Sequence, residues 1–241
     1  MRKKVVNMSD WMSSRREDRL YKEIYVDEEI SDRAYNGVIG GVVVYGLLVN
    51  VAICYIFQDR ILNVNPIALI VAYFICCIAG TFLSAKSDNA ILSFVGYNLV
   101  VVPVGMVVSI AVYAYGGLGS EVVVQAFLIT MLTTGFMVAF SVFKPEFFEK
   151  LGGLLFVCLS GLVIAELVLL LLGVDQIITA WIGAIVFSIY IAYDFHRAQA
   201  FPKTLDNAVD SALDIYLDII NLFLKILRIL GSKGRGSSKR R

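Results

Sequence analysis

The sequence predicts an all-α membrane protein, a polytopic bundle of seven helices whose last helix carries a polar stripe. Hydrophobic residues make up 59% of the chain and charged residues 17%, whereas a soluble domain has roughly a quarter charged residues. The charges gather at the two ends of the chain and in short loops. Between them lie apolar runs close to the ~20 residues with which a helix crosses the hydrocarbon core. The alternation of a membrane β-barrel is absent.

Three regions follow from this distribution. We expect a polar N-terminal tail (1–34), a seven-helix transmembrane domain (35–230) and a basic C-terminal tail (231–241). The seven expected segments run over residues 35–57, 66–85, 90–113, 122–143, 151–172, 177–193 and 208–230.

Local signals separate these segments. A polar loop ends the first, and Pro66 stands at the first turn of the second, where proline is favoured. The third and fourth are joined by a turn with three glycines, and the fifth follows a loop that contains Lys144 and Lys150. The sixth ends where its apolar run reaches Asp194, and the seventh differs from the others because aspartates interrupt it.

Basic residues in the short loops predict the orientation, since such residues favour the cytoplasmic side. The N-terminal tail is rich in arginine and lysine, so we expect it in the cytoplasm, and the inner loops then hold Lys86, Lys144, Lys150, Arg197 and Lys203. The outer loops hold only Arg60. If the seventh segment crosses fully, the basic C-terminal tail lies outside. If it re-enters or stays embedded among the others, the tail stays inside, which the bias of basic residues toward the cytoplasm favours. Compact loops favour a bacterial plasma membrane.

The pattern of cysteine and histidine predicts no cofactor. All four cysteines fall inside apolar segments, which is typical of small core residues, and His196 is the only histidine. His196 and Arg197 are interpreted as an ordinary basic loop. We therefore expect the lipid bilayer and small ions as partners, with no bound nucleic acid.

Aspartates in the last two segments are the candidate functional residues. Asp210, Asp214 and Asp218 are spaced i, i+4 and i+8, and Asn221 and Lys225 continue the same helix face. Such a face must meet water, protein or an ion path, because facing lipid costs several kcal/mol per charge.

Two arrangements of this seventh segment stay open. It lies on the membrane surface with solvated acids, or it lies inside the bundle with Asp218 close to Asp194. Surface helices usually carry basic polar faces, which favours the second arrangement. We interpret Asp210 and Asp214 as surface, entrance or capping groups near the helix start. Glu166, inside the fifth run, either faces the bundle interior or lies near the outer interface, and the second position is favoured because only a few residues separate it from Gly173.

A close pair formed by Asp194 and Asp218 has predictable chemistry. Two carboxylates in contact in a poorly hydrated site share one proton near neutral pH and titrate as a unit. When both are ionised, the pair offers a transient oxygen site for a hard cation such as Ca²⁺. The same pair can therefore serve proton sensing and cation passage.

Two stretches resemble the Bax inhibitor-1 family, also called transmembrane Bax inhibitor motif proteins. Residues 211–228, SALDIYLDIINLFLKILR, are similar to its C-terminal signature, and residues 186–194, VFSIYIAYD, to its second hallmark. The resemblance implies a seven-helix bundle with a central last helix, and a pH-sensitive calcium leak with Asp194 and Asp218 as the sensor. It also implies a basic latch at the end of the second helix, for which Lys86 is the candidate here.

Three functions compete at this point. The first is the pH-gated calcium leak. The second is a non-transporting regulator of a membrane protease or of a cell-death or stress partner, with residues 1–34 as its contact surface. The third is an intramembrane aspartyl protease, which requires Gly-x-Gly-Asp around the second aspartate; here Ile215, Tyr216 and Leu217 precede Asp218. We therefore expect no enzyme.

Overall fold

The computed structural model describes residues 29–87 and 89–238 of the chain. Within them it holds seven long helices and two helices of five residues, and no strand. The long helices are α2 (Asp32–Ile56), α4 (Pro66–Lys86), α5 (Ala90–Ala114), α6 (Glu121–Phe143), α8 (Gly152–Leu171), α9 (Ile177–Ala200) and α10 (Leu205–Ser238). The short ones are α3 (Gln58–Leu62) and α7 (Pro145–Glu149). The predicted all-α class is confirmed.

Parts of the two predicted tails lie outside the described residues. These parts are residues 1–28 and 239–241, and the side chains of residues 233–238 are likewise not described. The prediction of a cytoplasmic polar N-terminal tail therefore falls mostly on residues without a structural description and stays a prediction.

Six helices in the described part of the chain are long and apolar enough to cross a bilayer, namely α2, α4, α5, α6, α8 and α9. Their outer faces expose large apolar side chains such as Ile70, Leu132 and Leu171, which suits contact with lipid. α10 is not among them, because aspartates and basic residues interrupt its apolar sequence. The chain is therefore a multi-pass membrane protein.

Polar side chains fix where several helices begin. Ser31 and Ser120 accept hydrogen bonds from backbone amides in the first turns of α2 and α6, at 3.2 and 3.3 Å. Asn65 and Asn89 do the same for α4 and α5, both at 2.9 Å. These caps satisfy amides that have no partner within the helix, so the boundaries follow from local sequence.

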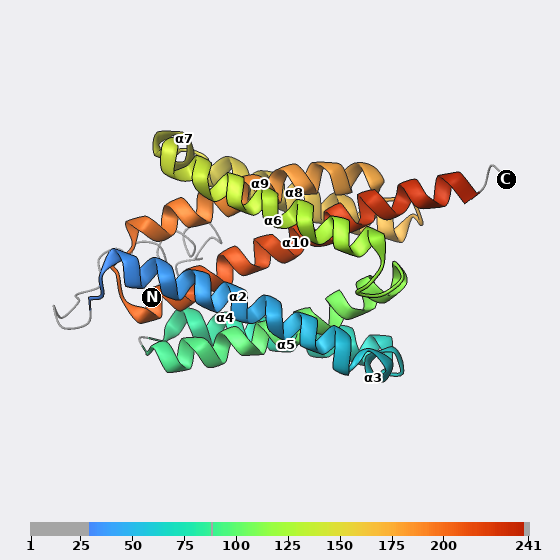
Figure 1. Cartoon of the computed structure of the whole chain (residues 1–241), viewed down its shortest axis with the longest axis horizontal. Coiled ribbons are helices and arrows are strands. Elements are labelled where there is room, and N and C mark those ends of the chain that lie inside the picture. Colours follow the sequence, from blue (N-terminus) through green and yellow to red (C-terminus); the bar gives the residue numbers. More distant parts are fainter. Residues whose placement is uncertain (1–28, 88, 239–241) are drawn as a thin grey trace, which may run out of the picture.

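α10 runs through the middle of the bundle and packs against α2, α5, α6 and α9 (Figure 1). Its first residues lie beside the start of α2, where the Ile30 amide donates to the Lys203 carbonyl at 2.8 Å. At the other end of the bundle, Gly231 lies against the Tyr115 ring, just past the end of α5. α10 therefore runs from one end of the bundle to the other without turning back, and it is embedded among the other helices.

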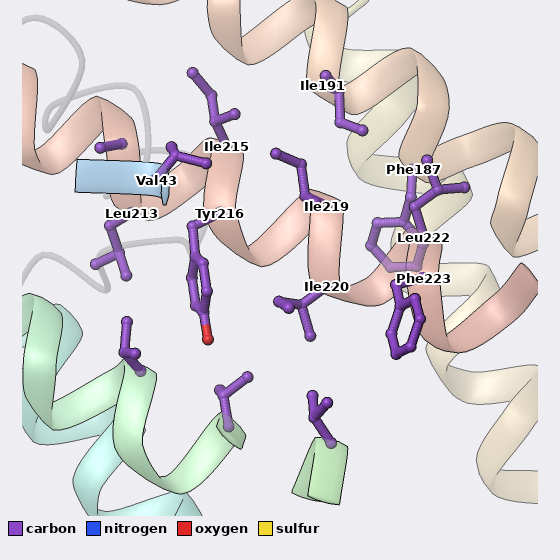
Figure 2. Packing of buried hydrophobic residues seen from close by; sticks show 14 of the residues in the cluster. Val43, Phe187, Ile191, Leu213, Ile215, Tyr216, Ile219, Ile220, Leu222 and Phe223 are labelled. Atoms are coloured by element: carbon purple, nitrogen blue, oxygen red, sulfur yellow. The ribbon is translucent and has the colours of Figure 1, made fainter. Parts of the chain in front are cut away.

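The apolar face of α10 contributes more residues to the main core cluster than any other helix. Figure 2 shows Tyr216, Ile219 and Phe223 among the buried side chains of the surrounding helices. On the partner helices, Ile39 of α2, Val101 of α5 and Ile191 of α9 belong to the same cluster. This packing leaves the polar face of α10 turned toward other polar side chains rather than toward lipid.

α9 is longer than the sequence predicted. The expected segment ended at Tyr193, where the apolar run stops, but the helix continues to Ala200. The fall in hydropathy at Asp194 marks a polar position inside the bundle and not a helix end, because the backbone hydrogen bonds of a helix do not depend on side-chain polarity. Asp194 and Arg197 consequently lie on one rigid helix.

α4 and α5 approach closely through a pair of glycines. A Cβ atom built on Gly80 would lie 2.5 Å from the Gly96 carbonyl oxygen, and one built on Gly96 would lie 2.7 Å from the Gly80 carbonyl oxygen. Small residues allow such backbone contact between membrane helices. Gly80 and Gly96 therefore bring α4, and with it Ser84, close to α10.

We expect Gly80→Ala to lower the stability of the protein, because the added methyl group forces the two backbones apart. Overpacking of this kind costs about 1–3 kcal/mol. The measurement is the apparent Tm in detergent micelles. Gly135→Ala is the matched control, since a Cβ atom at Gly135 meets nothing within 4 Å. Equal Tm values for the two variants would contradict the close contact.

Candidate functional site

The structure brings Asp194 of α9 and Asp218 of α10 together. Both side chains are buried, each residue being 7% exposed, and their carboxyl groups are in hydrogen-bonding contact. The buried Asp218 Oδ2 has no hydrogen-bond partner among the described residues. A carboxyl group can hydrogen-bond to a carboxylate only when one of the two carries a proton, so the geometry fits a pair that shares one.

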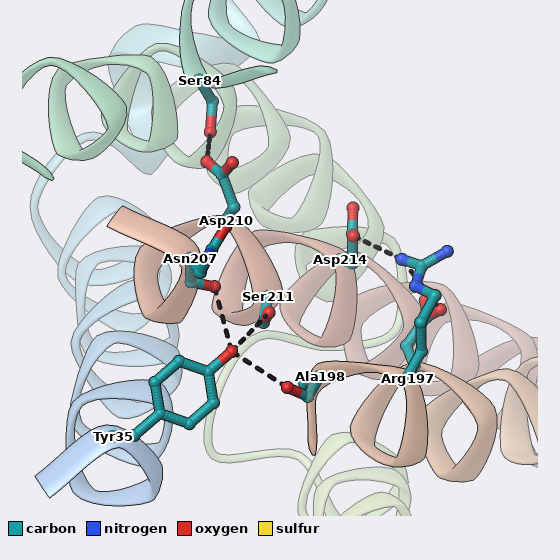
Figure 3. A network of polar contacts seen from close by, with 9 residues as sticks. Tyr35, Ser84, Arg197, Ala198, Asn207, Asp210, Ser211 and Asp214 are labelled. Atoms are coloured by element: carbon teal, nitrogen blue, oxygen red, sulfur yellow. Dashed lines mark hydrogen bonds and ion pairs between the residues drawn. The ribbon is translucent and has the colours of Figure 1, made fainter. Parts of the chain in front are cut away.

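Arg197 is the cation beside this pair. Its Nη2 lies 3.1 Å from Asp194 Oδ1, one turn earlier in α9, and 2.6 Å from Asp214 Oδ2 of α10 (Figure 3). Its guanidinium also lies over the Tyr193 and Phe201 rings, at 5.7 and 6.0 Å from their centroids. The interpretation of Arg197 as part of an ordinary basic loop is therefore wrong.

Lys86, the candidate latch, lies at the end of α4 and is exposed. Its ammonium group lies 4.2 Å from the centroid of the Phe82 ring. The latch role of Lys86 stays a prediction, while the guanidinium in contact with Asp194 belongs to Arg197. Lys86 belongs to α4, whereas Arg197 belongs to α9. The expectation of a basic residue at the end of the second segment therefore pointed to the wrong helix for the contact with Asp194.

The structure places Asp210 in the interior of the bundle and Asp214 in a half-buried position. Asp210 is 7% exposed and accepts a hydrogen bond from Ser84 Oγ of α4 (Figure 3), so the surface interpretation is wrong for Asp210. Asp214 is half-buried in its ion pair with Arg197. Both residues lie between the start of α10 and Asp218, on the same face of the helix.

Asp206 is a further acid that the sequence analysis missed. It is buried and accepts a hydrogen bond from Ser93 Oγ of α5 at 2.6 Å. Its signal was present in the sequence, because it precedes Asp210 by one more step of four residues. The expected segment began at residue 208, however, and so excluded Asp206.

The start of α10 is held by a hydroxyl group from α2. Tyr35 Oη lies 3.3 Å from Ser211 Oγ of α10 and donates to the Ala198 carbonyl of α9 at 3.1 Å (Figure 3). Tyr35 is fully buried. One side chain thus joins α2, α9 and α10 beside the aspartates and fixes the spacing of the helices that carry them.

The far half of α10 carries a different set of polar groups. Asn221 donates to the Leu217 carbonyl within its own helix at 2.8 Å, and Lys225 forms an ion pair with Glu166 of α8. Glu166 therefore faces α10, the first of the two positions left open for it, although it also lies close to the end of α8. Arg228 donates to Gln176, which precedes α9.

The acids do not form a resident metal site of ordinary composition. In the described ranges no group of three or more His, Cys, Asp or Glu side chains is arranged to hold a metal ion. Stable Ca²⁺ sites supply six to eight oxygen ligands, and Asp194 with Asp218 supplies at most four. Asp194 and Asp218 alone therefore supply fewer oxygen ligands than a stable Ca²⁺ site.

Comparison with known proteins connects this geometry to a family. The family model described as "Inhibitor of apoptosis-promoting Bax1" matches residues 29–235. An uncharacterized protein of Helicobacter pylori strain J99 is 37% identical over 123 residues, which cover 50% of this chain and 51% of that protein. The inner membrane protein YbhL of Escherichia coli K12 is 31% identical over 122 residues, covering 46% and 52%. Bax inhibitor 1 of Schizosaccharomyces pombe is 32% identical over 119 residues, covering 46% and 43%.

The chain spans about half the length of the curated relatives it matches. The family model, in contrast, matches almost the whole transmembrane bundle, including both helices that carry the aspartate pair. The chain belongs to the Bax inhibitor-1 family.

Proposed function

We propose that this protein is a pH-sensitive cation leak, with calcium as its ion, and that Asp194 and Asp218 gate it. The observation that carries the proposal is the buried contact of these two carboxyl groups between α9 and α10. A stability role alone does not explain the pair, because apolar residues would pack the same helices together without the cost of burying acids. A titratable contact between two helices allows the protonation state of the contact to control how closely the two helices pack.

The closed state rests on a shared proton. With one proton between them, Asp194 and Asp218 hydrogen-bond and join α9 to α10. Loss of that proton leaves two adjacent negative charges, which repel strongly in a poorly hydrated interior. Arg197 offsets one of the three nearby carboxylates and keeps Asp214 beside the pair. Rising pH therefore weakens the contact and creates an anionic, oxygen-rich passage.

Acids on one face of α10 supply the approach to the pair. Asp206, Asp210, Asp214 and Asp218 follow one another at steps of four residues, from the start of the helix inward. Carboxylate oxygens are the ligands that Ca²⁺ prefers. The geometry supports a cation path, and only the family resemblance specifies calcium.

The membrane and orientation belong to the same proposal. YbhL is named as an inner membrane protein, which supports a bacterial plasma membrane for this chain. The basic residues of the N-terminal tail favour a cytoplasmic N-terminus. Since α10 crosses the bundle, the start of α10 then faces the cytoplasm and its basic end faces outward.

Asp218→Asn and Asp194→Asn test the gate directly. Asparagine keeps the shape and can donate a hydrogen bond, but it does not ionise, so we expect Ca²⁺ flux into proteoliposomes to lose its rise between about pH 6 and pH 8. Glu146→Gln, at an exposed position in α7, is the control and should keep the response. An unchanged pH response in both aspartate variants would overturn the proposal.

Arg197→Gln tests the counter-charge in the closed site. Without the guanidinium, ionised Asp194 and Asp214 are uncompensated, and breaking a buried pair costs about 3–5 kcal/mol, less where water reaches it. We expect the apparent Tm to fall, and to fall further at pH 8 than at pH 6, because protonated acids need no counter-charge. Lys86→Gln is the comparison. If it, and not Arg197→Gln, shows the pH-dependent loss, then Lys86 is the counter-charge.

A second candidate function is a non-transporting regulator of a membrane protease or of a cell-death or stress partner. The family description, "Inhibitor of apoptosis-promoting Bax1", and the name of the fission-yeast relative favour this candidate. The proposed contact surface is the polar N-terminal tail.

Affinity capture with the full chain and with a form lacking residues 1–28, which keeps the Ser31 cap and all of α2, separates the two functions. If the chain is a regulator, a partner is captured only by the full chain, and proteoliposomes show no Ca²⁺ flux at any pH. If the chain is a leak, flux persists in the shortened form, because the described bundle begins only at Asp32.

A further inference from the structure

A second charged contact lies on α10, beyond the aspartate pair. Lys225 Nζ forms an ion pair with Glu166 of α8, and the side chains are 12% and 24% exposed. A charged side chain among membrane helices faces the bundle interior or a water-filled path and needs a partner. This contact has no part in the gate proposed above.

A glycine of α9 gives Lys225 its route to α8. A Cβ atom built on Gly183 would lie 2.9 Å from Lys225 Cε and 3.1 Å from Lys225 Cδ. The lysine side chain thus crosses α9 over a position without a side chain and reaches Glu166 on the next helix. The ammonium group is held by this passage, so it does not extend along α10 to the membrane surface.

Lys225 lies on the same face of α10 as the acids. Asp218, Asn221 and Lys225 follow one another at steps of three and four residues, so they share one side of the helix. At a rise of 1.5 Å per residue, Lys225 lies about 10 Å along the axis from Asp218. Lys225 is the next charged residue after Asp218 along this helix.

Two other charged residues, Arg228 and Asp175, lie at this end of the bundle, and each has different surroundings from the Lys225–Glu166 pair. Arg228 is bonded to Gln176, a neutral amide, and lies one turn farther along α10. Asp175 lies in the connection between α8 and α9, where it borders an open pocket together with Tyr115 and Ser232. Glu166 is therefore the acid that contacts Lys225 within the bundle.

We propose that the Glu166–Lys225 ion pair is a second constriction on the cation path and sets how easily a cation leaves the bundle. This inference rests on the leak function proposed above. The ammonium group of Lys225 repels a passing cation, and the carboxylate of Glu166 offsets that repulsion. Lys225 thus lowers cation flux and Glu166 raises it, although the ion pair holds both side chains in place.

Opposite effects of the two single variants test this constriction. In proteoliposomes containing the full chain, Glu166→Gln leaves an uncompensated ammonium group and lowers Ca²⁺ flux, while Lys225→Met leaves an uncompensated carboxylate and raises it. One uncompensated unit charge within a few ångströms of a passing cation changes the flux by on the order of tenfold. The double variant falls between the two, and the pH at half-maximal flux stays that of the unsubstituted protein.

The ratio of Ca²⁺ flux to the amount of folded protein in the same vesicles, quantified from the monodisperse gel-filtration peak, removes differences in folding yield. We expect this ratio to fall in Glu166→Gln and to rise in Lys225→Met. Glu149→Gln and Lys150→Gln, at exposed positions at the end of α7, are matched controls that keep the ratio unchanged.

Three results would overturn the inference. Equal changes of the ratio in the same direction would make the pair a purely structural contact, and an unchanged ratio in both variants would place it off the path. Both results leave the leak function intact. If the unsubstituted protein conducts no Ca²⁺ at any pH, the proposed function fails first and the second constriction fails with it.

Discussion

The polar face of α10 cannot be exposed to lipid, and the arrangement of the other helices follows from this constraint. A charged side chain at the centre of a bilayer costs at least about 2.5–3.5 kcal/mol. α10 avoids this cost because the surrounding helices supply partners for its charges. The partners are Ser93 of α5, Ser84 of α4, Asp194 and Arg197 of α9, Glu166 of α8 and Gln176 before α9. Removing α10 would leave these groups without their contacts.

The two sides of α10 are held by different kinds of contact. On one side Tyr216 accepts a hydrogen bond from Asn50 of α2 at 2.8 Å, and its ring lies 5.6 Å from that of Tyr97 of α5. These contacts do not change near neutral pH, since a tyrosine hydroxyl ordinarily ionises near pH 10. On the other side α9 contacts α10 through the Asp194–Asp218 pair as well as through the Arg197–Asp214 ion pair and the Tyr35 hydroxyl group. In the proposed mechanism, proton loss therefore acts on α9 locally, at the aspartate pair, while α2, α5 and α10 keep their contacts.

Most of the fold could be predicted from the sequence because lipid imposes a simple rule on helix length. The long apolar runs appear as helices that begin and end within a few residues of the expected positions. Asp194 and Asp218 could be paired in advance, since each interrupts an apolar segment and the two segments are neighbours in the chain. The prediction ended too early at Tyr193, however, because hydropathy falls where a helix becomes polar as well as where it stops.

The missed contacts depend on tertiary structure. A sixth segment that ends at Tyr193 places Arg197 in a loop. A seventh segment that begins at residue 208 excludes Asp206. Glu166 and Lys225 lie 59 positions apart, and nothing in the spacing of either residue indicates the other. The passage over Gly183 that joins them depends on how α8, α9 and α10 pack. For Glu166 and Lys225, local patterns identify two charges within apolar segments but do not identify them as partners.

The charges of α10 change sign along the helix, and helix electrostatics explains only part of this pattern. An acid in the first turn interacts favourably with the helix dipole, so Asp206 is stabilising whatever the protein does, whereas Arg228 lies ten residues before the end of α10 and gains little from the dipole. Lys225 and Glu166 are different, because Glu166 lies on α8 and has no part in the dipole of α10. A buried ion pair adds little net stability over apolar residues of the same size. Packing therefore does not require a charge at either position, whereas a path that carries ions must control the charge it presents along its whole length.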